Sequence, residues 1–287
     1  MKLPFALARR FVAAETLDDT IPVVRKLNAK GLYVTLDQLG EYVSDRKVAV
    51  EATDAYVDLL KRIAEERRDS RLDANISIKL SMLGQKIDEG LCCDNLLRLL
   101  SAATEHDIFV RLDMEGSDLT DSTLGLFERA YPLHRDHVGV VLQAYLHRTA
   151  EDVARMCELK ARVRLCKGAY KEPPGIAYQD MPVIRERFIE YMQRLIDRAR
   201  YPGIATHDDI LIDATRDFVS RNGIKQDRYE FQMLYGVRPK TQEQIASDGY
   251  RMRVYVPFGT QWLPYYMRRI RERKENLWFV VKNLFRK

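Results

Sequence analysis

The sequence VYVPFGTQWLPYYMRRIRERKEN at residues 254–276 combines a short strand, a turn and a basic helix, and the repetition of this unit decides the fold. Residues 254–258 are β-branched and aromatic, which is typical of a strand, and Gly259 begins the turn. The helix then carries Arg268 and Arg269 side by side. Because adjacent guanidinium groups repel each other, the pair indicates a ligand with paired oxygens, such as a carboxylate or a phosphate. A solvated basic face is the alternative, since further basic residues follow directly.

Strand–helix units of the same kind precede this one along the chain. We expect the strands at residues 32–36, 76–80, 108–114, 138–146, 163–169, 204–206 and 229–234, and the helices between them at 49–66, 94–105, 120–130, 150–160, 183–200, 210–221 and 241–248. With the last unit, this makes eight in a chain of 287 residues, which predicts an α/β protein with a (β/α)8 barrel of the TIM type. A doubly wound open sheet is the alternative.

The chain shows no linker or shift in composition that would divide it. Residues 1–30 are expected to form a helical segment, in which Asp19 or Thr20 caps a helix with Pro22 in its first turn. Gly31 ends that helix, and residues 32–287 would form the barrel. We therefore expect a single domain over residues 1–287.

The composition is that of a globular protein. Hydrophobic residues make up 46% of the chain, enough for a sizeable core. The balance of 47 basic and 42 acidic residues gives a net charge of +5, and no basic arm with interleaved aromatics occurs, so we do not expect nucleic acid as a partner. The four cysteines form no CxxC pair or Cys/His cluster, which favours a reducing compartment. The N-terminal apolar run is too short for a signal peptide, and no stretch has the length of a membrane span.

Charged and amide residues interrupt the expected strands, although parallel strands are usually apolar throughout. They are Lys79, Arg111, Asp113, Glu115, Gln143, Arg164, Lys167, His207 and Gln232. Most of them lie toward the carboxyl ends of the strands, where barrels hold their ligands. A single buried polar residue is usually a satisfied core group, but the same feature on six strands indicates a functional site. A structural polar network is the alternative.

Lys79 and Asp113 lie on consecutive strands at similar heights, so we expect them to pair. The pair is either a structural ion pair or a device by which Asp113 directs Lys79 toward an anion. In the segment 163–170, Gly168 and Ala169 allow a planar ligand to approach the backbone, and Arg164 can donate to a heteroatom of that ligand. The alternative there is an ordinary junction between strand and loop.

His207 is followed by Asp208 and Asp209, which raises the question of a metal. The three side chains do not have the spacing of a helical ligand pair, and Glu115 would have to join them from another strand. We therefore expect no metal site.

These residues together make the chain resemble the flavin-dependent proline dehydrogenase family, and most closely its short monofunctional bacterial members. The resemblance covers residues 32–276 and is carried by seven motifs in matching order: SIKLSMLG, VRLDMEG, VVLQAYLHRT, VRLCKGAYKE, ATHDD, YEFQMLYGVR and YYMRRIRERKEN. It implies a distorted (β/α)8 barrel that holds non-covalent FAD at the strand carboxyl ends. It also implies oxidation of L-proline to Δ1-pyrroline-5-carboxylate by hydride transfer to the flavin N5, the first step of proline catabolism.

The resemblance implies roles for individual residues as well. The catalytic group would be Lys79, Asp113, Tyr255, Arg268 and Arg269, with Lys79 and the two arginines on the proline carboxylate and Asp113 holding Lys79. The wall around the proline ring would be Tyr170, Leu234, Tyr255 and Tyr265. The FAD contacts would be Arg164 beside N5, Gln143 at the ring edge, Cys166, Lys167, Gly168 and Ala169 around the cofactor, Thr206 and His207, and Glu272 at a flavin hydroxyl.

By the same resemblance, the electrons would pass to a membrane quinone. The protein would then be cytoplasmic and meet the inner face of the cell membrane transiently. A separate pyrroline-5-carboxylate dehydrogenase would act downstream, because the sequence shows no aldehyde dehydrogenase module.

The chain departs from the family pattern at two places beside the flavin. Cys166 stands where many members carry valine, and Lys171 stands where some carry tryptophan, which leaves the exposure of the flavin open. Two other classes of protein remain as alternatives. One is a different flavin barrel, such as a methylenetetrahydrofolate reductase, and the other is a metal-dependent barrel lyase or a non-catalytic ligand-binding barrel.

Overall fold

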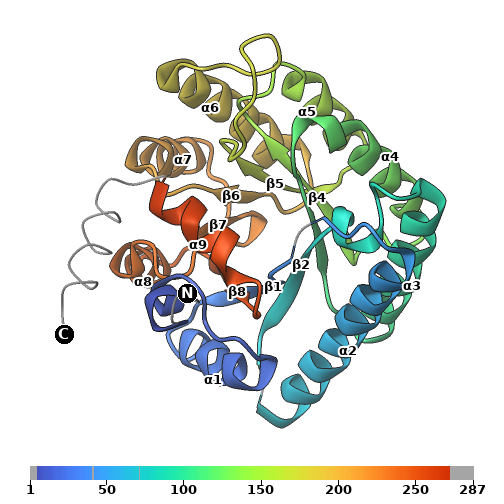
Figure 1. Ribbon diagram of the computed structural model, residues 1–287. Helices are drawn as coiled ribbons and strands as arrows, with labels where there is room; N and C mark the ends of the chain where they lie inside the picture. Colours follow the sequence, from blue (N-terminus) through green and yellow to red (C-terminus); the bar gives the residue numbers. More distant parts are fainter. Residues whose placement is uncertain (1–4, 41, 71, 272–287) are drawn as a thin grey trace.

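The expected strands form a closed parallel barrel, which the computed structural model shows over residues 5–40, 42–70 and 72–271 (Figure 1). The strands follow one another around the barrel in chain order. Strand β1 (Tyr33–Gln38) closes it against β8 (Met252–Phe258), with Tyr33 opposite Arg253. The closure confirms the (β/α)8 barrel. It excludes the open sheet, because the two edge strands of an open sheet do not pair with each other.

The remaining strands are β2 (Ala74–Lys79), β3 (Val110–Asp113), β4 (Val138–Gln143), β5 (Arg162–Cys166), β6 (Gly203–Ala205) and β7 (Glu230–Leu234). The helices α2 (Arg46–Ser70), α3 (Glu89–Glu105), α4 (Thr120–Ala130), α5 (Thr149–Glu158), α6 (Met181–Arg198), α7 (Asp209–Arg221), α8 (Pro239–Ser247) and α9 (Trp262–Arg271) follow the strands in turn. The 3-10 helix η1 (Phe5–Arg10) and α1 (Leu17–Asn28) precede the barrel, and the turns η2 (Leu80–Leu83), η3 (Ser117–Leu119) and η4 (Gln226–Arg228) lie in its loops.

The apolar core lies between the strands and the outer helices. Successive side chains of a strand point to opposite faces, so alternate residues face the helices. Val34, Leu36, Ile76 and Ile78 are such residues, and each is completely buried in the main apolar cluster. The opposite face of the same strands carries mostly polar side chains. The interior of the barrel is therefore a polar column instead of the layers of branched aliphatic residues common in such barrels.

The N-terminal segment packs against the last strand–helix unit. The backbone N–H of Ala13 donates to Pro257 O at 2.9 Å, and that of Gly259 donates to Ala14 O at 2.9 Å. An apolar cluster joins η1 to α9, and its buried members are Ala8, Phe11, Val12, Leu39, Val237, Trp262, Tyr265, Tyr266 and Ile270. The two ends of the described chain thus form one structural unit. No helix among the described residues is long and apolar enough to cross a membrane.

Two strands end three residues earlier than the sequence predicted. Strand β4 ends at Gln143 instead of residue 146, and β5 ends at Cys166 instead of residue 169. Gly168 has a φ of 126°, which belongs to a turn and not to a strand, so the chain leaves the barrel there. Beyond β4, the apolar residues 144–146 had extended the predicted run.

The predicted caps of the first helix were also wrong. Helix α1 begins at Leu17, and its N-cap is Thr16, whose Oγ1 accepts a hydrogen bond from the backbone N–H of Asp19 at 3.2 Å. Asp19 and Thr20 therefore lie in the first turn. There, the negative charge of Asp19 interacts favourably with the positive end of the helix dipole.

Gly139 on β4 gives a test of the close packing in the barrel. A Cβ at this position would lie 2.3 Å from the carbonyl oxygen of Arg162 and 2.7 Å from the ring of Phe109. We expect Gly139→Ala to lower the free energy of unfolding by roughly 1–3 kcal/mol, the usual cost of overpacking. Gly125 on α4 is the matched control, because an added Cβ meets no atom within 4 Å and alanine should gain up to about 1 kcal/mol in a helix. Chemical denaturation measures both, and equal stability of the two variants would contradict this packing.

Candidate active site

Polar side chains converge at one end of the barrel. Lys79 ends β2, Asp113 ends β3 and Gln143 ends β4, so three consecutive strands each bring a polar group to their carboxyl end. We call this end, where the strand carboxyl ends meet, the mouth of the barrel. Helix α9, red in Figure 1, lies over the β7–β8 side of the barrel and inside the ring of outer helices. The polar side chains and α9 together enclose the candidate site.

Lys79 is held by a carboxylate that the sequence analysis missed. Its Nζ lies 3.1 Å from Asp37 Oδ1, and the two side chains are only 8% and 1% exposed. The prediction that Lys79 pairs with Asp113 was therefore wrong, although the two residues are neighbours in register. Burial alone would lower the pKa of Lys79, but the charges of Asp37 and Asp113 outweigh it and raise that pKa, so the ammonium stays charged.

Asp113 instead joins an arginine and a tyrosine across the interior. Arg164 Nη1 donates to Asp113 Oδ1 at 2.6 Å, and the hydroxyl of Tyr255 donates to Asp113 Oδ2 at 2.7 Å. The guanidinium carbon of Arg164 also lies 5.3 Å from the centre of the Tyr255 ring. Burial raises the pKa of Tyr255, and the charge of Asp113 raises it further, so the phenol stays protonated as the donor in this bond.

Below this group, the polar column continues toward the other end of the barrel. Arg164 Nη2 donates to Ser77 Oγ at 3.0 Å, and Arg164 Nε donates to Gln232 Oε1. Gln232 Nε2 in turn donates to Glu230 Oε1 at 2.6 Å, and Arg253 Nε donates to the same oxygen at 2.8 Å. Burial alone would raise the pKa of Glu230, but the adjacent Arg253 guanidinium lowers it to about 2. The column thus orients Arg164 through a chain of buried hydrogen bonds.

Gln143 presents an acceptor that the described protein does not satisfy. Its Nε2 donates to Glu115 O at 3.3 Å, which fixes the orientation of the amide. Its Oε1 is buried and has no hydrogen-bond partner within the described ranges. Such an acceptor costs about 1–3 kcal/mol when it stays unpaired, so this atom indicates where a donor group of a ligand belongs.

Basic groups border the β5–β6 side of the mouth. Lys167 Nζ lies 3.0 Å from Asp208 Oδ2, and Arg185 Nε donates to the same oxygen at 2.8 Å. Thr206 Oγ1 accepts from the backbone N–H of Asp208 at 3.1 Å. One carboxylate therefore orders two cations beside the start of α7.

The side chain of His207 is hydrogen-bonded to the backbone of the next strand, β7. Its Nε2 accepts the N–H of Leu234 at 2.9 Å, and its carbonyl accepts from Arg238 Nη1 at 2.6 Å. Across residues 5–40, 42–70 and 72–271, no group of three His, Cys, Asp or Glu side chains is placed to hold a metal.

The residues after β5 lie along the edge of the mouth. Cys166 Sγ donates to Leu142 O at 3.6 Å, and burial raises its pKa to about 12, so the group is a thiol. Gly168 approaches Tyr145 so closely that an added Cβ would lie 2.3 Å from the ring. Ala169 is exposed and Tyr170 is half-buried.

The two adjacent arginines of α9 share one aromatic ring. The guanidinium carbons of Arg268 and Arg269 lie 5.8 and 5.2 Å from the centre of the Tyr265 ring. Arg269 is only 9% exposed and Arg268 is half-buried. A solvated basic face would leave both side chains in water, so this alternative is wrong for Arg269. Glu272, the predicted contact to a flavin hydroxyl, lies outside the described residues.

Asp37 was missed because the predicted first strand stopped at residue 36, whereas β1 continues to Gln38. Glu230 and Arg253 were not proposed for the site, and they lie at the far end of the polar column. The rule that singled out the other residues, a charged side chain inside a parallel strand, would have found Asp37 with a longer strand.

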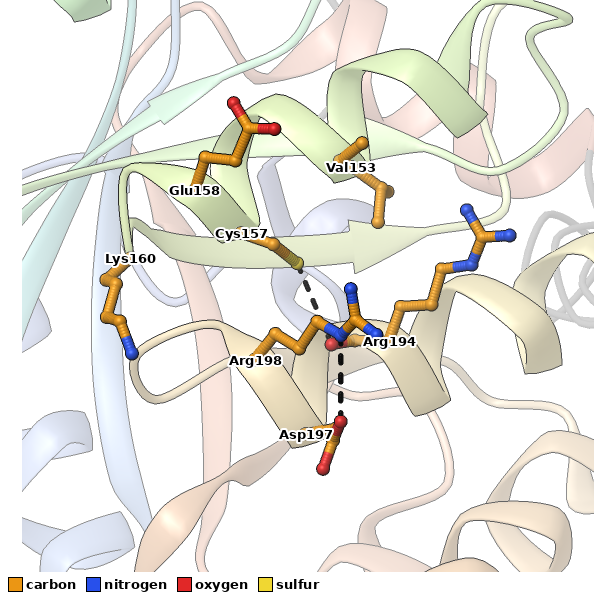
Figure 2. Close-up of a pocket in the computed structure, with 8 residues that line it drawn as sticks. Val153, Cys157, Glu158, Lys160, Arg194, Asp197 and Arg198 are labelled. Carbon is orange, nitrogen blue, oxygen red and sulfur yellow. Dashed lines mark hydrogen bonds and ion pairs between the residues drawn. The ribbon is translucent and has the colours of Figure 1, made fainter.

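A separate hollow of about 690 Å³ lies between α5 and α6 (Figure 2). Cys157 Sγ donates to Arg194 O there at 3.7 Å, and Arg198 Nε lies 3.7 Å from Asp197 Oδ2. These residues belong to the C-terminal halves of the two helices, which run back toward the opposite end of the barrel. The hollow is therefore distinct from the mouth.

The fold and the mouth define a (β/α)8-barrel enzyme with a buried polar site of paired cationic and anionic side chains. The sequence model of the family described as "Proline dehydrogenase" matches residues 20–282. Proline dehydrogenase 1 of Bacillus subtilis (strain 168) is 40% identical over 280 residues, which cover 98% of this chain and 91% of that protein. Proline dehydrogenase of Deinococcus radiodurans is 38% identical over 284 residues, which cover 98% of this chain and 90% of that protein.

A solved structure shows the same barrel. It is proline utilization A (PutA) from Bdellovibrio bacteriovorus inactivated by N-propargylglycine, with a TM-score of 0.86 and 25% identity. The match covers 93% of this chain and 32% of the PutA chain, so this chain corresponds to about a third of that protein. The chain belongs to the proline dehydrogenase family, and it is an oxidoreductase. The family match decides against the folate reductase and metal-dependent lyase alternatives.

Glu230 allows a test of the polar column by pH. Its pKa is lowered from an ordinary 4.5 to about 2, so its stabilising effect is present above pH 4.5 and is lost as the pH falls toward 2. We expect Glu230→Gln to lower the free energy of unfolding by roughly 3–5 kcal/mol at pH 7, because Arg253 loses its buried partner. The difference from the parent should shrink between pH 4.5 and 2.

The control for this test is Glu243→Gln, which breaks the exposed ion pair with Lys30 and should cost no more than about 1 kcal/mol. Chemical denaturation at several pH values measures all three proteins. A difference between the parent and Glu230→Gln that does not change with pH would contradict an ionised Glu230.

Proposed function

We propose that this chain oxidises L-proline to Δ1-pyrroline-5-carboxylate with FAD as its redox cofactor, as the first step of proline catabolism. The observation that carries the proposal is the buried polar mouth of a proline dehydrogenase family member, where Lys79 and Gln143 end β2 and β4 and Arg164 is bonded to Asp113 at the end of β3. The cations suit a carboxylate substrate and an electron-rich reduced cofactor.

The residues at the mouth fit a flavin. Gln143 Oε1 is a buried acceptor without a partner among the described residues, and the N–H at the edge of a flavin ring would satisfy it. Arg164 is held by Asp113, Ser77 and Gln232, so its guanidinium is pre-oriented and would stabilise negative charge on a reduced flavin. The predicted contacts Cys166, Lys167, Gly168, Ala169, Thr206, His207 and Glu272 are proposed to complete the FAD site.

FAD, when bound, supplies the two-electron acceptor that takes a hydride from the substrate carbon next to the ring nitrogen. Arg268 and Arg269, with Lys79, bind the proline carboxylate and so aim this carbon at the cofactor. Tyr170, Leu234, Tyr255 and Tyr265 form the wall around the ring and exclude water. An uncharged ring amine is required for hydride loss, and a dry, cationic surrounding disfavours the ammonium form.

Asp113 acts through the groups that it holds. Its two oxygens accept from Arg164 and Tyr255, so it fixes the guanidinium and the phenol relative to each other. In this role, Asp113 is a positioning residue both for Arg164, which faces the cofactor, and for Tyr255, which faces the substrate. Its charge also helps to keep Lys79 protonated for the substrate carboxylate.

The partners follow from the same proposal. The electrons pass from the reduced cofactor to a membrane quinone during transient contact with the inner face of the cell membrane. A separate pyrroline-5-carboxylate dehydrogenase consumes the product. Residues 1–287 act as a single domain in the cytoplasm.

The cofactor can be tested directly. The purified protein should be yellow, acid or heat should release FAD, and L-proline should bleach the visible flavin band. We expect Gln143→Leu to weaken FAD binding by about threefold to tenfold, because one neutral hydrogen bond contributes roughly 0.5–1.5 kcal/mol. Titration of the apoprotein with FAD measures this change. Release of FMN alone, or failure to take up FAD, would refute the cofactor assignment.

The arginine pair can be tested separately from the cofactor. A charge-assisted hydrogen bond to the carboxylate contributes roughly 1.5–3 kcal/mol, so Arg268→Met and Arg269→Met should each lower kcat/KM for proline by about ten- to a few hundredfold. The FAD content should not change. Arg221→Met, an exposed residue at the end of α7 that pairs with Asp217, is the matched control and should keep the parent kinetics. Parent-like kinetics in both α9 variants would mean that the pair does not bind the substrate.

A further inference from the structure

Two glutamates beside the mouth hold serines in the same way. Glu115 accepts the hydroxyl of Ser81 at 2.8 Å and its backbone N–H at 3.3 Å. Glu172 accepts the backbone N–H of Ser117 at 2.8 Å and its hydroxyl at 2.6 Å. In each case, one carboxylate takes both donors of a serine at a 3-10 turn in a different loop. These charge-assisted bonds are stronger than neutral ones.

The two contacts share one short segment, residues 115–117 after β3. Glu115 joins this segment to Ser81 in the loop after β2, and Ser117 joins it to Glu172 in the loop after β5. The carbonyl of Glu115 also accepts from Gln143 Nε2 at the end of β4. The segment therefore connects the ends of four consecutive strands around half of the mouth.

The loop from β5 to α6 depends most on these contacts, because it is long and carries Tyr170. Gly168 fixes its start, since its backbone lies against the Tyr145 ring and leaves no room for a Cβ. Glu172 fixes the loop two residues after Tyr170, and Gln179 Nε2 donates to the Glu172 carbonyl at 3.3 Å. Tyr170 is thus placed between two anchored positions.

We propose that Glu172 is a positioning residue for substrate binding, which acts through Ser117 to hold Tyr170 at the wall of the proline site. The inference rests on the proposed function, in which Tyr170 lines that wall. A saturated five-membered ring offers few polar groups, so the enzyme must recognise it by the shape of a rigid wall. Loss of the anchor would weaken binding of substrate and transition state equally, which raises KM and leaves kcat unchanged.

The test compares a graded set of variants in the FAD-loaded enzyme. We expect Glu172→Ala to raise KM for L-proline about tenfold, with kcat within about twofold of the parent. Ser117→Ala keeps one of the two bonds, and Glu172→Gln replaces the charge-assisted bonds by neutral ones, because its amide can accept the backbone N–H and donate to the hydroxyl. Each should raise KM only about threefold. Glu151→Ala, an exposed glutamate on α5, is the matched control and should match the parent.

Two further measurements separate positioning from general loosening. Hydrogen exchange of the amides at residues 169–172, 175 and 176 should be faster in Glu172→Ala. Ser117→Ala should raise KM no further when it is combined with Glu172→Ala. Faster exchange with an unchanged KM would overturn the positioning role and leave only a structural contact. Additive effects of the two substitutions on KM would show that the two residues do not act through their mutual bond, which also overturns the proposal.

Tyr170→Ala distinguishes this proposal from the function on which it rests. A raised KM in Tyr170→Ala with a parent-like KM in Glu172→Ala would refute the anchor alone. A parent-like KM in Tyr170→Ala would remove Tyr170 from the wall and overturn the anchor with it. Absence of proline oxidation by the parent protein would refute the proposed function itself.

Discussion

The ion pair between Asp113 and Arg164 is the interaction on which the site depends. A guanidinium inside a barrel is far from water, so it needs an opposite charge and further acceptors to remain stable. Arg164 obtains all of these from the interior faces of other strands, because Asp113 lies on β3, Ser77 on β2 and Gln232 on β7. Tyr255 adds β8 through its bond to Asp113. One charged group therefore fixes the relative positions of five strands at the level where the site lies.

This arrangement separates stability from function within one barrel. The outward faces of the strands and the helices supply the apolar core, which provides most of the stabilisation. The inward faces hold polar groups whose burial gains little net free energy but permits only one arrangement, since any other leaves a charge unpaired. The result is a rigid polar interior, which suits an enzyme that must present fixed dipoles and charges to a reacting pair.

The sequence was sufficient to predict the barrel and several of the polar side chains at the strand ends, but not the hydrogen-bond partners of those side chains. The order of strand–helix units predicted the closed sheet, and polar residues inside strands marked Lys79, Asp113 and Gln143. The partner of Asp113 could not be predicted, because a sequence orders strands along the wall of the barrel and says nothing of contacts across its interior. Lys79 was assigned to its neighbour on β3 for a different reason: its actual partner Asp37, on the other neighbouring strand β1, lay one residue beyond the predicted first strand. Contacts between loops, such as that of Glu172 with Ser117, leave no periodic pattern at all.

The meeting of the chain ends has a consequence for the order in which the protein can be assembled. Strand β8 and helix α9 come late in synthesis, yet they pair with β1 and pack on η1, which come first. Until that late segment arrives, a growing chain has two open sheet edges and a Glu230 without Arg253. Contacts between distant parts of a sequence form slowly, because a long loop must close before they gain anything. Strand β8 closes the barrel and leads directly into the helix that carries the arginine pair, so a growing chain without this segment would lack both the closed sheet and part of the candidate site.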